Sequence, residues 1–206
     1  MSLRLYEDPD LDQIVTLRND FTNPDDEDDI NGDAGATKYK YLYAALECGK
    51  LAAGMDDSQE EMTLAAARFA DTSMFIGLIG TEKVRFLTGF GATSFTVERG
   101  YKGTTKAEHA SGATVWLCYQ AIAGKVLSYD VESPDEASMM TFCLAPGGVP
   151  DDNYNAHPDP LLLGNINPGQ IIQIRRRLIV PSGWSPIEKV DLMAKAYADF
   201  KEYTAA

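Results

Sequence analysis

One stretch, residues 95–116, constrains the fold most, because two alternating segments enclose a loop that contains Gly100 and Gly103. Apolar and polar residues alternate at positions 95–98 and again at positions 113–117. Alternation with a period of two residues is typical of a strand with one buried face. The two glycines tolerate backbone conformations that a Cβ atom disfavours. The stretch therefore predicts two strands joined by a structured loop.

The same loop has an alternative interpretation as a phosphate-binding cradle. A P-loop requires the order G-x-x-x-x-G-K-[ST] between a buried strand and a long helix. Here Lys106 follows the two threonines, and no long helical pattern comes after it. We therefore expect a glycine-containing connection between two strands of a small β unit.

The phrase VERGYKGTTKAEHASGATV resembles a recurring stretch in structural proteins of tailed bacteriophages. There a strand, an Arg-Gly, a Gly-Thr pair and a His-x-x-Gly follow in this order. The matching positions are Arg99, Gly100, Gly103, Thr104, His109 and Gly112.

A Gly-x-Glu strand at residues 80–82 matches the same class of protein. Residues 21–43 and 165–183 are similar to turns and strands of phage immunoglobulin-like domains. The resemblance implies a virion protein that contains such a domain.

The net charge excludes two classes of partner. The chain carries a formal charge of −13, and a field of this sign repels nucleic acid and anionic lipid. The apolar runs fall far short of the ~20 residues of a membrane helix, and the N-terminal residues lack the apolar segment of a secretory signal. We expect a protein that is made in the cytoplasm of a bacterial host and carried on the virion, without nucleic-acid or membrane partners.

The cysteines and histidines give little scope for metal or redox chemistry. Cys48, Cys118 and Cys143 form no C-x-x-C pair, and two histidines in 206 residues cannot build a multi-histidine site. No cofactor is expected. Cys48 and Cys118 bracket residues 49–118, and two interpretations stay open: a thiol pair at the neck of an inserted domain, or two unrelated buried cysteines.

Residues 24–37 are rich in aspartate and lack aromatic side chains, which predicts a loop. Clustered carboxylates are ligands that calcium prefers. Alignment with the helix-loop-helix calcium motif, however, puts Lys38 where a bidentate Glu belongs. An irregular calcium site is thus the alternative to a solvated acidic loop, with the candidate ligands Asp25, Asp26, Asp28, Asp29 and Asp33.

The rest of the chain reads as strands separated by turns. Alternating or β-branched segments predict strands at residues 3–6, 14–17, 38–46, 74–79, 82–88, 94–98, 125–131, 139–144 and 170–180. Residues 82–88 and 94–98 are expected to pair as a hairpin. Residues 145–160 contain four prolines and predict a long surface loop, and Pro168-Gly169 predicts a type II turn.

Three consecutive arginines lie in the strand predicted at residues 170–180. Alternation places Arg175 and Arg177 on one face and Arg176 on the other, with the apolar residues. Either a bulge intervenes or Arg176 pairs with a carboxylate. A nucleic-acid patch is disfavoured, because no basic surroundings support it.

The C-terminal segment fits two patterns. Ser185 to Glu188 form a capping box that favours a helix, whereas the alternation from Val190 onward favours a strand. A sandwich needs a neighbour for the preceding strand, and we therefore predict a strand.

These patterns predict an all-β fold: an immunoglobulin-like β-sandwich formed by residues 1–48 and 119–206, with a small β module inserted at residues 49–118. The expected function is that of a non-enzymatic virion structural protein of a tailed phage. It would be an accessory or capsid-decorating component of head, neck, tail or baseplate that contacts other virion proteins and copies of itself. The alternative is a carbohydrate- or host-receptor-binding module. The residues expected to make contacts are Arg99, Tyr101, Lys102, Thr104, His109, Tyr154, Arg175, Arg176, Arg177 and Trp184.

Overall fold

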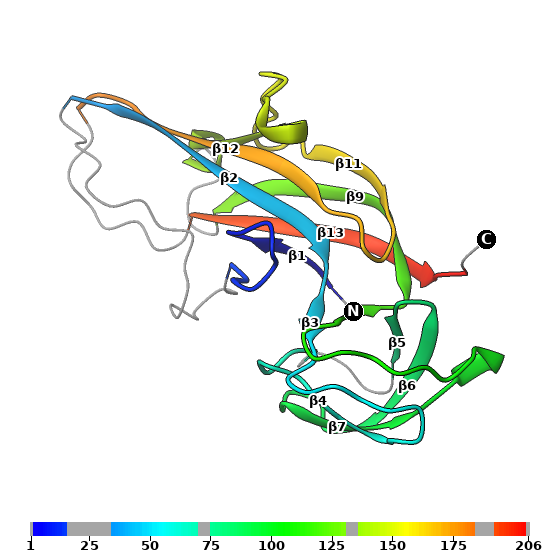
Figure 1. Cartoon of the computed structure of the whole chain (residues 1–206). Coiled ribbons are helices and arrows are strands. Elements are labelled where there is room, and N and C mark those ends of the chain that lie inside the picture. Colours follow the sequence, from blue (N-terminus) through cyan, green and yellow to red (C-terminus); the bar gives the residue numbers. More distant parts are fainter. Residues whose placement is uncertain (1, 16–33, 70–74, 131–135, 184–191, 205–206) are drawn as a thin grey trace.

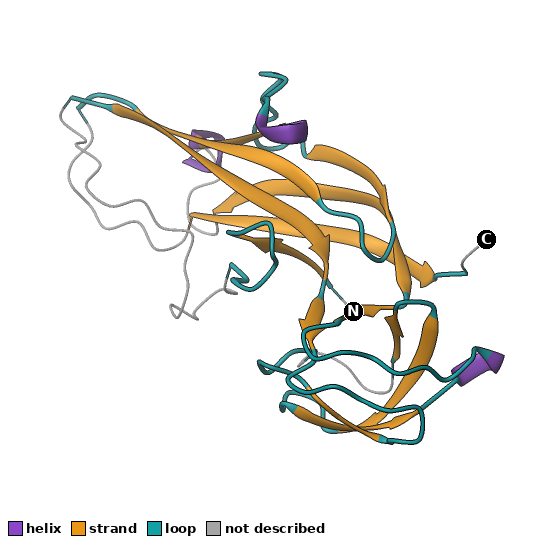
Figure 2. Cartoon of the chain, viewed as in Figure 1, coloured by secondary structure: helices purple, strands orange, loops and turns teal. Residues whose placement is uncertain are grey.

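The computed structural model describes residues 2–15, 34–69, 75–130, 136–183 and 192–204. Strands dominate these residues, and the helical elements among them are short 3-10 turns (Figure 2). The strands are β1 (Leu3–Tyr6), β2 (Ala36–Leu46), β3 (Cys48–Lys50), β4 (Glu61–Thr63), β5 (Ile76–Ile79), β6 (Glu82–Thr88), β7 (Ser94–Glu98), β8 (Thr114–Leu117), β9 (Tyr119–Asp130), β10 (Met140–Leu144), β11 (Leu161–Ile166), β12 (Ile172–Val180) and β13 (Leu192–Glu202). The prediction of an all-β chain is confirmed.

Two antiparallel sheets form a sandwich (Figure 1). One sheet has the order β1-β2-β12-β10 and the other the order β11-β9-β13. From β9 to β13, successive strands alternate between the two sheets. Immunoglobulin domains order their strands differently, so the likeness to them lies in the two-sheet architecture, which many sandwich domains share.

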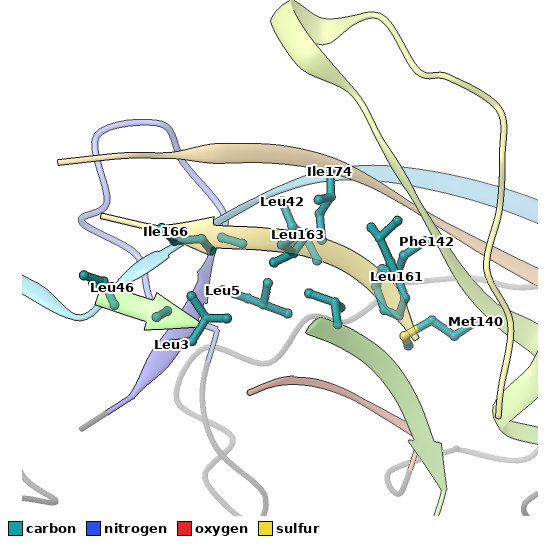
Figure 3. Packing of buried hydrophobic residues seen from close by; sticks show 13 residues of the cluster. Leu3, Leu5, Leu42, Leu46, Met140, Phe142, Leu161, Leu163, Ile166 and Ile174 are labelled. Carbon is teal, nitrogen blue, oxygen red and sulfur yellow. The ribbon is translucent and has the colours of Figure 1, made fainter. Parts of the chain in front are cut away.

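The core of the sandwich consists mainly of aliphatic side chains from both sheets, together with Phe142 of β10 (Figure 3). Leu3 and Leu5 of β1 point inward because alternate residues of a strand share one face. Leu42 and Ile174 meet them from the central strands, and Leu161 contributes from the opposite sheet. Burying a leucine or isoleucine side chain stabilises the fold by about 1.5–3 kcal/mol. The apolar residues of the alternating segments thus form the core.

A third sheet, with the order β3-β8-β5-β6-β7-β4, is built from the intervening residues. The chain enters this sheet at Cys48, after β2, and returns to the sandwich at Tyr119. Its two edge strands meet at an isolated bridge between Leu51 and Leu64. Two backbone hydrogen bonds flank the bridge, Ala52 N to Thr63 O at 2.8 Å and Ala65 N to Lys50 O at 2.9 Å. The curled sheet therefore closes on itself around a second core.

Four phenylalanine rings pack against one another within this second core. Phe75 stacks on Phe86 with ring centroids 4.1 Å apart, and Phe95 meets Phe86 edge-on at 5.1 Å. Phe69 contacts Phe75 at 4.9 Å. The third sheet thus has a hydrophobic cluster separate from that of the sandwich.

Most predicted strands coincide with observed ones. The predictions at residues 3–6, 82–88 and 94–98 match β1, β6 and β7, and the last two pair as the expected hairpin. The C-terminal segment is strand β13 from Leu192 onward, whereas residues 184–191 lie outside the described residues. Pro168-Gly169 forms the predicted turn, with Gly169 at φ +83° and a bond of 3.0 Å from Gln170 N to Asn167 O.

Three strands were not predicted, and one prediction was wrong in part. β3 and β4 have three residues each, which are too few to show a period. β11 begins with three consecutive leucines and continues with Gly164 and Asn165, so its apolar and polar residues do not alternate. At Ile14 the structure has an isolated bridge to Tyr6 instead of a strand. Residues 16 and 17 of that predicted strand lie outside the described residues.

The cysteines are free thiols and buried. Cys48 lies opposite Trp116 in the β3–β8 register, and the Tyr6 hydroxyl accepts a hydrogen bond of 3.3 Å from its backbone N–H. Burial raises the pKa of the Cys48 thiol to about 11. Cys48 and Cys118 therefore flank the neck between the sheets without a disulfide bond.

Candidate functional site

The predicted contact loop at residues 99–105 is organised by a buried carboxylate, that of Glu82 at the start of β6. Glu82 accepts hydrogen bonds from Arg99 Nε at 2.7 Å and Arg99 Nη2 at 2.9 Å. The backbone N–H groups of Gly100 and Ala107 donate to it at 2.9 and 3.1 Å. A ring nitrogen of His109 lies 2.9 Å from Oε2. We call Glu82, Arg99 and His109 the Glu82 cluster.

Arg99 also holds two other loops in place. Its Nη1 donates to the carbonyl oxygens of Asp56 at 2.7 Å and Gln59 at 3.1 Å, and its Nη2 donates to Ala107 O at 2.6 Å. The side chains of Arg99 and Glu82 are both fully buried. The prediction that Arg99 makes external contacts is therefore wrong.

The hydrogen bonds keep Glu82 ionised. Burial by itself would raise the pKa of this carboxyl, but the donors from Arg99, His109, Gly100 and Ala107 outweigh burial and lower it to about 2. A carboxylate with this pKa is not poised to donate a proton near neutral pH. The Glu82 carboxylate already accepts hydrogen bonds from all of these donors, and the cluster stabilises the loops that supply them.

Gly100 and Thr104, which belong to the stretch that resembles phage proteins, also make contacts within this loop. Gly100 has φ +64°, and a Cβ atom there would lie 2.8 Å from Thr104 O. The Thr104 hydroxyl accepts from Lys83 N at 3.0 Å. Because the Gly100 N–H already points to Glu82, it is not available for a phosphate. Thr104 and His109 thus make internal contacts and are partly buried, and a role for them in external contacts stays a prediction.

Tyr101 and Lys102 lie at the outer end of this loop, in the 3-10 turn η1 (Tyr101–Gly103). The Tyr101 ring faces Arg85 at 5.5 Å and Lys102 at 5.8 Å. Lys102 forms an ion pair with Glu202 at the end of β13. Lys83 contacts the same carboxylate at 3.3 Å. Lys102 therefore connects the inserted sheet to the sandwich.

A second group of predicted residues comes together on the outer face of the β1-β2-β12-β10 sheet. β2 and β12 run side by side and project beyond the rest of the sandwich (Figure 1). Tyr39 lies directly opposite Arg177, and Tyr41 opposite Arg175. Tyr154, from the long loop between β10 and β11, joins them. We call Tyr39, Tyr41, Tyr154, Arg175 and Arg177 the Tyr–Arg face.

Aromatic rings and guanidinium groups alternate on this face. Arg175 lies 4.5 Å from the ring centre of Tyr39 and 5.3 Å from that of Tyr154. Arg177 lies 3.8 Å from the ring centre of Tyr154. Such cation–π contacts contribute about 0.5–1 kcal/mol each at exposed sites. The contacts hold the two arginines in fixed positions.

Hydrogen bonds add to this order. Arg175 donates to the Tyr154 hydroxyl and forms an ion pair with Asp152 at 2.8 Å. Arg177 Nε donates to the Thr141 hydroxyl at 3.1 Å. Burial raises the pKa of the Tyr154 hydroxyl, against the opposing effect of the Arg175 hydrogen bond. The long loop is thereby pinned onto the sheet.

The face remains open to contact. Tyr39 is 55% exposed and Tyr41 38% exposed. The Tyr41 hydroxyl donates to Gly148 O at 3.0 Å, which fixes its ring against the loop. Exposed tyrosines held beside arginines are typical of protein interfaces.

Arg176 differs from its neighbours because it is fully buried on the inner face of β12, as the alternation predicted. The registers of β12 with β2 and β10 run without a shift past this residue. The bulge alternative and the prediction of Arg176 as a contact residue are therefore wrong.

Some predicted site residues cannot be placed. Trp184 and the candidate calcium ligands Asp25, Asp26, Asp28, Asp29 and Asp33 lie outside the described residues. Within the described ranges, no group of three or more His, Cys, Asp or Glu side chains is arranged to hold a metal ion. None of the helices in those ranges has the length and apolar character needed to span a membrane.

The sequence interpretation missed Glu82 and the two exposed tyrosines of β2 as site residues. Glu82 stands first in an alternating strand, on the same side as Val84 and Phe86, and a charged residue on an apolar face is the signal for a buried partner. Tyr39 and Tyr41 lie on the face opposite Leu42. The spacing of these residues does not predict that β12 lies beside β2.

Comparison of the chain with protein-family models, with curated proteins and with solved structures gave no match.

Proposed function

We propose that this chain is a non-enzymatic structural protein of a tailed-bacteriophage virion that acts through protein–protein contacts. The observation that carries the proposal is the Tyr–Arg face, where exposed tyrosines and ordered arginines lie on a rigid sheet. Tyr and Arg are enriched in protein interfaces and among the residues that contribute most to binding there.

The phage part of the proposal rests on the sequence resemblance, and the Glu82 cluster supports it. Arg99, Gly100 and His109 of the phage-like phrase all bond to Glu82, which is itself part of the similar Gly-x-Glu strand. Residues that build a fold together are expected to recur together in proteins with that fold. The resemblance therefore concerns a structural module, and the proposed role is an accessory or decorating component of the particle.

The carbohydrate-binding alternative has less support. Sugar rings stack on free aromatic faces, but the ring of Tyr154 already has Arg177 at 3.8 Å, and cations lie over the ring of Tyr101. Trp184, another aromatic side chain that a sugar ring could stack on, lies outside the described residues.

The proposal is tested by cryo-electron microscopy of phage particles purified from a lysate in which this chain is produced. We expect sandwich density with the curled six-stranded sheet attached, in symmetric copies, and peptides of the chain in the particle by mass spectrometry. A chain that is absent from the particles, yet abundant in the lysate, would contradict the virion role. Specific binding to a glycan array by the isolated protein would instead support the alternative.

A further inference from the structure

The Tyr–Arg face contains two guanidinium groups, and they differ in how their charge is balanced. Arg175 has the Asp152 carboxylate at 2.8 Å. Arg177 has the Thr141 hydroxyl at 3.1 Å and the ring of Tyr154 at 3.8 Å. Among the residues that the structure describes, no carboxylate pairs with Arg177 and no acceptor meets its Nη1 or Nη2. Within the described part of the chain, the charge of the half-buried Arg177 thus has no counter-charge, although the protein as a whole is acidic.

The side chain of Arg177 is also fixed in position. An arginine on a protein surface normally loses much of its rotamer freedom when it binds a ligand. Here the stacking on Tyr154 and the hydrogen bond to Thr141 already restrict the side chain. Part of the entropic cost of binding is therefore met before any ligand arrives.

The hydrogen bond to Thr141 also decides which edge of the guanidinium remains open. Nε is occupied, so the Nη1 and Nη2 groups form the edge that no acceptor from the described residues meets. Two parallel N–H groups on one edge match the two oxygens of a carboxylate, and the resulting bidentate pair is short and strong. A carboxylate is therefore the chemistry that this edge fits.

We propose that Arg177 binds an aspartate or glutamate side chain of a partner protein. The inference rests on the proposed function and names the chemistry of one of its contacts. Tyr39, directly opposite Arg177 in the register and 55% exposed, would cover the apolar part of the same partner segment. An acidic sugar fits less well, because the rings beside Arg177 already carry guanidinium groups on a face.

The test is a titration of the intact chain followed by NMR. The probe is the capped peptide acetyl-Glu-Thr-Glu-Thr-Glu-amide, and the control peptide has glutamine in place of each glutamate. The signals are the Nε–Hε group of Arg177 and the backbone amides of β12. Glucuronate serves as a separate probe for an acidic sugar.

The matched control variant is Arg85→Lys. Arg85 is also a half-buried arginine beside a tyrosine ring, 5.5 Å from Tyr101, but it has the Glu98 carboxylate at 3.3 Å. Arg177→Lys keeps the positive charge and removes the two parallel N–H groups of Nη1 and Nη2. Equal melting temperatures of the two variants and the parent establish that both remain folded.

We expect the glutamate peptide to shift the Arg177 signal saturably and the glutamine peptide to leave it unchanged. Arg177→Lys should weaken binding about tenfold, the effect of losing one charge-assisted hydrogen bond, and Arg85→Lys should not. Equal shifts from both peptides, or equal losses in both variants, would overturn the assignment of the site. Tighter binding of glucuronate than of the peptide would overturn the assignment to a protein partner.

The titration and the particle assay fail independently. A titration without binding removes the Arg177 contact but leaves the chain in the particle. A chain absent from particles removes the virion role, whereas peptide binding at Arg177 would still be measured.

Discussion

The replacement Glu82→Gln tests the Glu82 cluster most directly. The carboxylate accepts from five donors, and two of these belong to the buried guanidinium of Arg99. Glutamine has nearly the same shape but carries no charge, and its NH₂ group would face donors such as the backbone N–H of Ala107. The variant therefore leaves the Arg99 charge buried without a counter-charge.

Two independent arguments give the magnitude. Removing one partner of a buried ion pair costs about 3–5 kcal/mol. The fall in the pKa of Glu82 from 4.5 to about 2 corresponds to ~3 kcal/mol of stability at neutral pH. We therefore expect Glu82→Gln to lower the free energy of unfolding of the inserted sheet by about 3–5 kcal/mol.

The assay is urea denaturation combined with hydrogen exchange at residues 99–112, whose backbone the cluster holds. The matched control is Glu98→Gln, since Glu98 is an exposed partner of Arg85 at 3.3 Å with its side chain 49% accessible. Exposed ion pairs contribute about 0–1 kcal/mol. If Glu82→Gln cost no more than Glu98→Gln, the reasoning about the buried charge would be refuted.

The same cluster predicts a pH dependence. Because the folded-state pKa of Glu82 is lowered, its stabilisation is complete above pH 4.5 and is lost as the pH falls through about 2. Urea denaturation between pH 6 and pH 2 should show this loss in the parent protein and a flatter profile in Glu82→Gln. Parallel profiles would contradict the assignment of the pH dependence to Glu82.

Three further replacements test the packing. Gly89→Ala places a Cβ atom 2.1 Å from a backbone oxygen at φ +91°, and should lower the melting temperature more than Gly80→Ala, where nothing lies within 4 Å. Phe86→Ala removes a ring stacked at 4.1 Å and should cost about 3–5 kcal/mol in urea denaturation. Glu202→Gln removes the 3.3 Å contact to Lys83 and should cost about 1 kcal/mol or less, with faster exchange at the junction between the sheets.

Each of these predictions has a contradicting outcome. Equal melting temperatures for the two glycine variants would show that the backbone at position 89 relaxes freely. A loss below ~1 kcal/mol in Phe86→Ala would mean that the ring cluster is loosely packed. Unchanged exchange at the junction in Glu202→Gln would mean that the ion pairs do not hold the sheets together.

The period-two pattern was sufficient to predict most strands but not their neighbours. Alternation along residues 82–88 and 170–180 identified β6 and β12, and it placed Arg176 on the inner face. Arg99, however, was expected to make contacts, because it stands at the start of a loop. Its partner Glu82 lies 17 residues away along the chain and one strand away in the sheet. Register decides such pairs, and the sequence alone does not give the register between segments.

The sequence by itself determined the all-β class, the turn at Pro168-Gly169 and the acidic charge, because each depends on local backbone preference or on composition. Only the tertiary structure decided that Arg99 is internal and that Nη1 and Nη2 of Arg177 meet no acceptor among the described residues. Both outcomes depend on which side chains from distant segments come within hydrogen-bonding distance. The same local pattern, an arginine in or beside a strand, is compatible with a buried ion pair and with an exposed binding residue, and the packing of neighbouring strands selects between them.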